Sequence, residues 1–115
     1  MNRLLRSLLM AFCLLICGLT IAPISTQAAP ATGAALFEAQ CVGCHIGGGN
    51  IIRRGKTLQL KALKKNGYDT AEAIATIVSQ GKNNMSAYSD RLSPEEIAIV
   101  SAYVLEQANA GWPRS

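Results

Sequence analysis

The chain has 115 residues, of which 50% are hydrophobic and only 5% are aromatic, and its formal net charge is +4. This length allows one small domain and excludes a multidomain enzyme. Aliphatic residues are dense only over 4–24, and the remainder is an ordinary mixture of polar and apolar residues. This distribution excludes an all-membrane protein and a disordered tail.

Residues 1–28 have the three parts of a secretory signal peptide. Arg3 and Arg6 provide the basic start, an apolar run extends over 8–24, and small residues precede the predicted cleavage site after Ala28. Cleavage removes the two arginines and leaves residues 29–115 as a single domain with a net charge of +2.

Three other interpretations of this segment are weaker. Cleavage after Ala29 would place Pro30 directly beyond the cut, where proline is unfavourable. An uncleaved membrane anchor would need a longer apolar run without interruptions. Lipid attachment at Cys17 is disfavoured by the bulky Ile16 before it. We therefore expect no stable membrane insertion after cleavage.

The first predicted helix covers 33–40, with Thr32 as its cap and with Leu36 and Phe37 on its buried face. It leads into Cys41-Val42-Gly43-Cys44-His45, the C-x-x-C-H pattern of covalent haem c attachment. The two thiols of this pattern form thioether bonds to the haem, and the histidine binds the iron as its proximal ligand. One helical turn brings both sulfurs to the same edge of the porphyrin.

Other kinds of site share part of this pattern. The cysteines could form a disulfide or a thioredoxin-like redox pair, but no βαβ pattern surrounds them. A zinc site would need a second pair of Cys or His ligands, which residues 29–115 do not contain. Haem also supplies the apolar surface that a domain with so few aromatic residues lacks.

Three further helices are predicted after the motif. The second covers 58–65 with Thr57 as its cap, the third begins at Asp69 and ends at Gln80, and the fourth extends from the cap Ser93 to about 108. Segments 47–50 and 82–90 are predicted loops. Apolar residues at helical spacing mark the buried faces of the last two helices, namely Ala73, Ile74, Ile77, Val78, Ile97, Val100, Tyr103 and Val104.

Met85 lies in the loop between the last two helices and is the only methionine of residues 29–115, which contain no second histidine. A lone methionine more often fills a core. A haem iron needs a sixth ligand, however, so elimination points to Met85. His/Met ligation raises the reduction potential and suits electron transfer. With both axial positions filled, we expect an electron-transfer protein and not an enzyme.

These features together resemble the cytochrome c6 family of class I cytochromes c, the electron carriers of cyanobacterial and algal photosynthesis. The resemblance covers nearly all of residues 32–112. It includes Gly33 and Phe37 before the haem motif, Tyr103 in the last helix, the loop Gly81-Lys82-Asn83-x-Met85-x-Ala87-Tyr88 and the closing Gly111-Trp112. It implies an all-α class I cytochrome c fold with four short helices around one covalently bound haem c.

Two positions depart from the family pattern. Ser86 stands where the family usually has a proline after the axial methionine, so this loop is expected to be less rigid. Ile77 stands where the family usually has a glutamine near the haem. We therefore expect a lower reduction potential than in the standard family member, as in a variant subgroup.

The resemblance implies a monomeric carrier of the thylakoid lumen or periplasm that shuttles electrons between membrane redox complexes. The cytochrome b6f complex would be its donor and photosystem I its acceptor. A respiratory terminal oxidase is the alternative acceptor. A haem sensor or enzyme in which Met85 is displaced is a further alternative.

Basic residues are candidates for partner docking. Arg53 and Arg54 could steer the domain toward an acidic partner, and Arg91 resembles a family arginine near the haem edge. A second basic cluster is interpreted as solvated surface, namely Lys61, Lys64 and Lys65. A net charge of only +2 without a platform of aromatic residues disfavours binding to nucleic acids.

Overall fold

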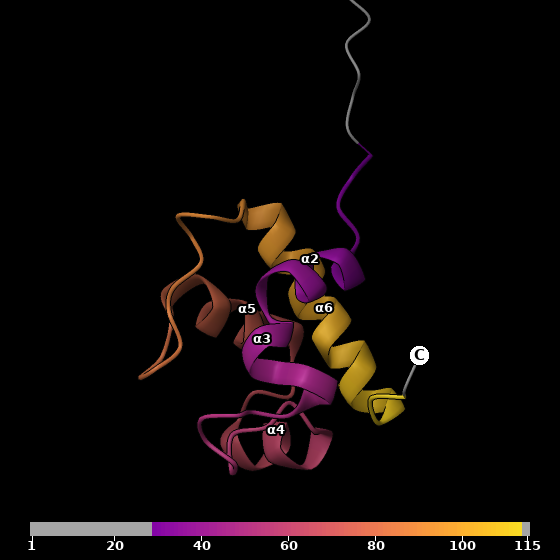
Figure 1. Ribbon diagram of the computed structural model, residues 1–115, viewed down its shortest axis with the longest axis vertical. Coiled ribbons are helices and arrows are strands. Elements are labelled where there is room, and N and C mark those ends of the chain that lie inside the picture. Colours follow the sequence, from indigo (N-terminus) through magenta and orange to yellow (C-terminus); the bar gives the residue numbers. More distant parts are fainter. Residues whose placement is uncertain (1–28, 114–115) are drawn as a thin grey trace, which may run out of the picture.

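The computed structural model describes residues 29–113, which form a small helical domain (Figure 1). No strand is present within these residues, so the predicted all-α class is confirmed. The predicted signal peptide over 1–28 lies outside the described residues. The helices are α2 (Gly33–Gln40), α3 (Val42–His45), the 3-10 helix η1 (Ile46–Gly48), α4 (Leu60–Asn66), α5 (Ala71–Gln80) and α6 (Pro94–Ala110).

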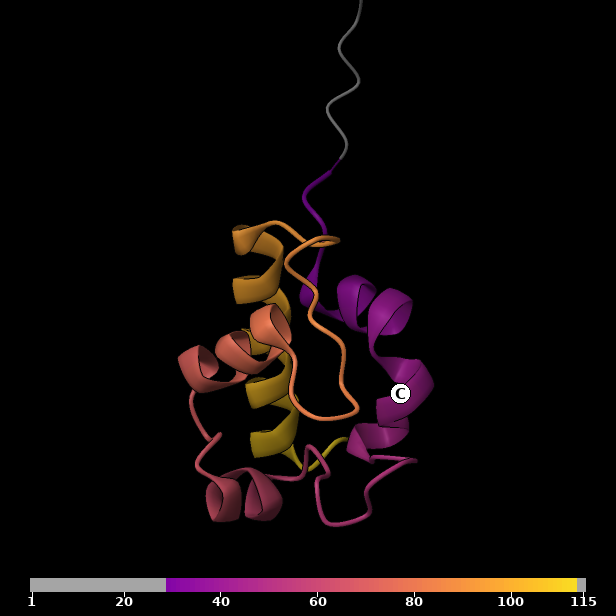
Figure 2. The same cartoon turned by 90° about the vertical axis from the view of Figure 1, so that its left-hand side faces the viewer.

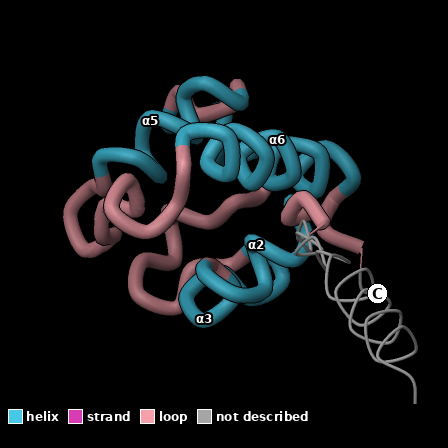
Figure 3. The backbone as a smooth tube through the Cα atoms, turned by 90° about the horizontal axis from the view of Figure 1, so that it is seen from above, coloured by secondary structure: helices cyan, strands magenta, loops and turns pink. Residues whose placement is uncertain are grey.

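The long helix α6 is the centre of the fold, because α2, α4, α5 and η1 all pack against it. Figure 3 shows α5 and α6 on one side of the domain and α2 and α3 on the other, with loop segments between them. The buried core follows this arrangement and consists of Leu36, Phe37, Leu63, Ile74, Val78, Leu92, Ile97, Val100, Val104 and Ala108.

The contact between α2 and α6 depends on a glycine. A Cβ atom at Gly33 would overlap Cβ of Tyr103 and would lie 3.0 Å from the carbonyl oxygen of Ile99. Leu36 and Phe37 are buried as predicted, and the Phe37 and Tyr103 rings lie 5.7 Å apart. The missing side chain at Gly33 thus lets the helix that precedes the haem motif lie directly against α6.

Local capping signals set three helix starts. Thr32 caps α2 as predicted, since its Oγ1 accepts a hydrogen bond from Ala35 N at 3.2 Å. Ser93 and Glu96 form a capping box at the start of α6, with distances of 3.2 and 2.8 Å between each side chain and the other residue's amide. The predicted cap of the third helix was wrong by one residue, because Thr70 and not Asp69 bonds the amide of Ala73.

The start of the second helix was also predicted wrongly. Leu58 N donates to Gly48 O at 2.8 Å, and Leu58 O accepts a hydrogen bond from the Trp112 indole at 3.0 Å. These distant partners hold Leu58 in the loop. The helix α4 therefore begins only at Leu60, with Gln59 as its N-cap.

Two other boundaries differ from prediction. The predicted loop over 47–50 is preceded and partly replaced by α3 and η1, so the haem motif is itself helical up to His45. The last helix extends to Ala110, two residues beyond the predicted end. It stops there because Gly111 adopts a left-handed φ of 77° and donates to Ala108 O.

Candidate haem site

One cavity brings together the four residues singled out as haem ligands. Cys41, Cys44 and His45 line it from the side of α2 and α3, and Met85 lines it from the loop between α5 and α6. Figure 2 shows this loop facing α2 and α3 across the domain. Residues 44 positions apart in the sequence, Cys41 and Met85, therefore contribute to the same site.

The imidazole of His45 is held in one orientation. Its Nδ1 lies 2.8 Å from the carbonyl oxygen of Gly49. A carbonyl oxygen can only accept, so Nδ1 carries the proton and Nε2 keeps a free lone pair. This tautomer is the one that a metal-binding histidine needs when its other nitrogen is hydrogen-bonded.

The two cysteines differ in their surroundings. Cys41 is half-buried, and burial raises the pKa of its thiol from 9.0 to about 11. A thiol is already protonated near neutral pH at its usual pKa of 9.0, and burial in this apolar cavity disfavours the thiolate further. Cys44 is exposed at the rim of the same cavity, one helical turn away.

Met85 ends a tight turn. Lys82 and Met85 exchange two backbone hydrogen bonds, of 2.9 and 3.0 Å, around Asn83, which adopts a φ of 53°. Gly81 packs directly against this turn, since a Cβ atom at Gly81 would lie only 2.7 Å from Met85 O and from Ala87 N. The half-buried side chain of Met85 is thus presented by a backbone that packs closely against Gly81.

The remaining walls fit a large flat apolar group. They are formed mainly by aliphatic side chains, namely Leu63, Ile74, Ile77, Val78, Val100 and Val104, together with Phe37. Two thiols at one rim, an imidazole with a free nitrogen and a thioether on the opposite side make up the donor set of a His/Met haem c. The side chains that line the cavity therefore fit a haem c.

The basic candidates occupy different places. Arg53 is exposed and lines the cavity, whereas Arg54 is exposed and does not line it. Arg91 lies outside the cavity with its Nε 3.6 Å from the Asp90 carboxylate, so its charge is partly compensated. Ile77 lines the cavity, as its predicted place beside the haem requires.

Sequence reasoning missed several residues that shape this site. Asn50 accepts hydrogen bonds from Ile52 N and Arg53 N, at 3.0 and 2.7 Å, and so folds the loop that carries Arg53. An asparagine after three glycines is a typical turn signal and could have indicated this role. Tyr88 also lines the cavity and bonds to Gln40. No local signal could have found that pairing.

Two known proteins are similar to this chain over most of its length. A "Cytochrome c6-like" protein of Nostoc sp. is 54% identical over 112 residues, which cover 97% of this chain and 99% of the relative. "Cytochrome c6" of Aphanizomenon flos-aquae is 51% identical over 83 residues, or 72% of this chain and 95% of the relative. The chain belongs to the cytochrome c6 family.

Solved structures and a family model support the same assignment. The crystal structure of cytochrome c6C from Synechococcus sp. PCC 7002 is similar with a TM-score of 0.67 and 62% identity, over 68% of this chain and 95% of that one. Cytochrome c6B from Synechococcus sp. WH8102 gives a TM-score of 0.69 and 48% identity, over 72% and 94%. Residues 28–104 match the family model described as cytochrome c oxidase, cbb3-type, subunit III.

Membership of this family has two direct consequences. The chain is a cytochrome c6-type electron carrier, and it holds one covalently bound haem c. The described residues contain no group of three or more His, Cys, Asp or Glu side chains that could hold a metal ion. Within residues 29–113, no helix is long and apolar enough to span a membrane.

Proposed function

We propose that Cys41 and Cys44 attach the haem and that His45 and Met85 are the axial ligands of its iron. The observation that carries this proposal is the single cavity in which these four side chains meet from opposite sides. The hydrogen bond from His45 Nδ1 to Gly49 O supports it, because it leaves Nε2 for the iron. The bound haem supplies reversible one-electron chemistry.

The protein's own residues then determine how the electron is held. One part of the cavity wall is formed by the buried aliphatic side chains of Leu63, Val100 and Val104, which exclude water. Because less solvent has to reorient when the charge changes, the reorganisation energy of electron transfer is lowered. Ile77 places an apolar group beside the haem, and we propose that it tunes the reduction potential. No open coordination position is left for a substrate.

We further propose how the protein is exported and between which complexes it carries electrons. The segment 1–28 is a signal peptide cleaved after Ala28, and the mature protein is a soluble monomer of the thylakoid lumen or periplasm. It carries electrons from the cytochrome b6f complex to photosystem I. A second candidate acceptor is a respiratory terminal oxidase, which the matching oxidase-subunit family favours.

A redox titration of the purified holoprotein, combined with its absorption spectrum, tests the site. Methionine-ligated ferric haem has a weak far-red charge-transfer band, which Met85→Ala should abolish and Met85→His should not restore. High-spin features or ready binding of carbon monoxide in the wild type would instead favour a sensor or an enzyme. The measured potential then excludes any acceptor whose own potential lies well below it.

We propose Arg53, Arg54 and Arg91 as docking residues, and the rate of electron transfer tests the first two. The six basic residues between Ile46 and Asn66 have no acidic neighbour in that stretch, which makes it strongly positive. If Arg53 and Arg54 steer the encounter, Arg53→Gln/Arg54→Gln should slow oxidation by photosystem I at low salt and flatten its salt dependence. Lys64→Gln/Lys65→Gln is the control of equal charge change, and an equal effect there would contradict specific docking.

A further inference from the structure

The break between α2 and α3 leaves one backbone carbonyl without a helical partner. In a continuous helix the amide of Cys44 would donate to Gln40 O, but it donates to Cys41 O at 3.1 Å instead. The amide of His45 also donates to Cys41 O, at 2.9 Å. The carbonyl of Gln40 is therefore available as an acceptor at the end of α2, directly before the first cysteine of the haem motif.

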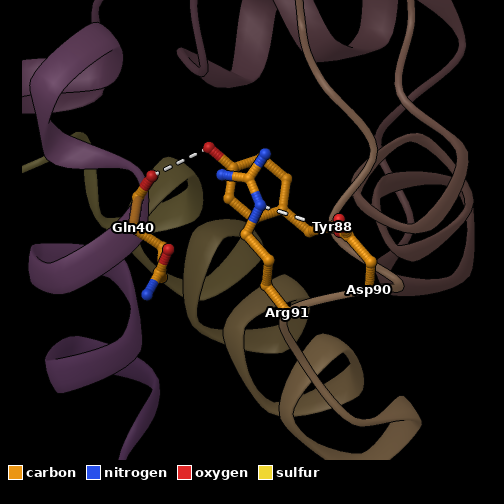
Figure 4. A network of polar contacts seen from close by, with 4 residues as sticks. All are labelled: Gln40, Tyr88, Asp90 and Arg91. Atoms are coloured by element: carbon orange, nitrogen blue, oxygen red, sulfur yellow. Dashed lines mark hydrogen bonds and ion pairs between the residues drawn. The ribbon is translucent and has the colours of Figure 1, made fainter.

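The phenol of Tyr88, which follows Met85 by three residues, points toward this carbonyl (Figure 4). Its hydroxyl donates to Gln40 O at 3.1 Å and joins residues 48 positions apart in the sequence. Both residues line the cavity. The hydrogen bond therefore connects the segment that carries Cys41 and His45 with the loop that carries Met85.

The position of Tyr88 is itself fixed by its backbone and ring. Its amide donates to Val78 O of α5 at 2.9 Å, and its carbonyl accepts from Arg91 N and Leu92 N, at 2.9 and 2.8 Å. The Arg91 guanidinium lies over the ring, 4.8 Å from its centroid, and is held by Asp90 (Figure 4). These contacts fix the position of Tyr88 independently of the hydrogen bond between its hydroxyl and Gln40.

The loop between Met85 and Tyr88 packs against Gly81, but within the described residues Ser86 and Ala87 add no backbone hydrogen bond of their own. Ser86 and Ala87 are exposed, and neither amide donates a hydrogen bond within residues 29–113. Ser86 also lacks the φ restriction that a proline would give this position. The bond from Tyr88 to Gln40 is therefore the first attachment after Met85 to the opposite side of the cavity.

We propose that Tyr88 is a positioning residue that holds Met85 on the haem iron by bonding its loop to the Gln40 carbonyl. This inference rests on the proposed ligation of the iron by Met85. When the hydroxyl is removed, the loop loses its connection to the haem-motif side while its attachment to α5 remains. Met85 should then leave the iron more often, with the rest of the domain intact.

The substitution Tyr88→Phe in the holoprotein removes only the hydroxyl. Imidazole competes with Met85 for ferric iron, so its apparent affinity and its limiting binding rate at high concentration both report departure of the loop. We expect Tyr88→Phe to raise the affinity and the limiting rate by about two- to tenfold, the range for loss of one hydrogen bond.

Two control variants separate positioning from general destabilisation. Tyr103→Phe removes a hydroxyl that has no hydrogen-bond partner within the described residues and lies away from the cavity, so imidazole affinity should not change. Ile97→Val weakens the buried core outside the cavity and lowers global stability. It too should leave imidazole affinity unchanged.

The results of these measurements distinguish the positioning role of Tyr88 from ligation of the iron by Met85. If the wild type shows the far-red band and Tyr88→Phe binds imidazole as the wild type does, the positioning role is overturned and ligation by Met85 stands. The role is equally overturned if Ile97→Val raises the affinity as much at a matched loss of global stability. If the wild type lacks the far-red band, ligation by Met85 and the role of Tyr88 both fail.

Discussion

The indole of Trp112 lies against Gly48 so closely that a Cβ atom at that glycine would overlap the ring. Gly48 adopts a left-handed φ of 73° and is buried, and the indole Nε1 donates to Leu58 O at 3.0 Å. Trp112, the second residue after α6, is thereby joined to the loop that follows the haem motif. The C-terminal end of the chain thus supports the segment that orients His45.

Substitution of Gly48 by alanine should displace Trp112. Overlap with the ring and the left-handed backbone both oppose the new side chain, so we expect a loss of about 1–3 kcal/mol in the free energy of unfolding. Trp112 is the single tryptophan of the chain, so its fluorescence, which haem quenches, should rise in the folded variant. Gly67→Ala is the matched control, because Gly67 has a similar left-handed φ of 74° but no atom lies within 4 Å of a Cβ at that position.

Gly33→Ala should weaken the contact between α2 and α6. The added methyl group would overlap Cβ of Tyr103 across the helix crossing, at a cost of about 1–3 kcal/mol in unfolding free energy. Chemical denaturation of the holoprotein measures this cost. A further change of Tyr103→Gly removes the Cβ atom that the methyl group would overlap, so an additive double variant would contradict the packing argument.

Ser101→Ala should stabilise the domain. The Ser101 side chain is completely buried, and its hydroxyl has no hydrogen-bond partner within the described residues. Removing an unpaired buried hydroxyl is expected to gain about 1 kcal/mol, which raises Tm by several degrees in a domain of this size. Ser79→Ala in α5 corrects for the higher helix propensity of alanine, and an equal gain there would refute the explanation.

Ile77→Gln should raise the reduction potential. Ile77 lines the cavity, and an amide that directs its N–H group toward the haem would disfavour the extra positive charge of the oxidised form. An interaction of about 1 kcal/mol corresponds to a shift of about 40 mV for one electron. Redox titration of the variant measures it, with Ile77→Leu as the apolar control. An unchanged or lower potential in Ile77→Gln would contradict the tuning role.

Local sequence signals determined much of this fold. Thr32 and the Ser93-Pro94-Glu95-Glu96 run place two helix starts correctly, because a cap needs only atoms a few residues away. The haem motif is local in the same way, since its five residues occupy little more than one helical turn. Family membership, the helical class and the haem followed from such patterns.

Contacts between distant segments decided the rest. The residues adjacent to Leu58 predict a helix there, but hydrogen bonds to Gly48 and Trp112 hold the Leu58 backbone in a loop. The Tyr88 hydroxyl can donate a hydrogen bond to Gln40 O only because α2 ends at Gln40 and the Met85 loop folds back over the cavity. Short-range spacing in the sequence thus determined the haem motif and predicted the groups proposed to hold the haem. Only the tertiary structure decided what orients those groups, because those partners are far apart along the chain and meet only after folding.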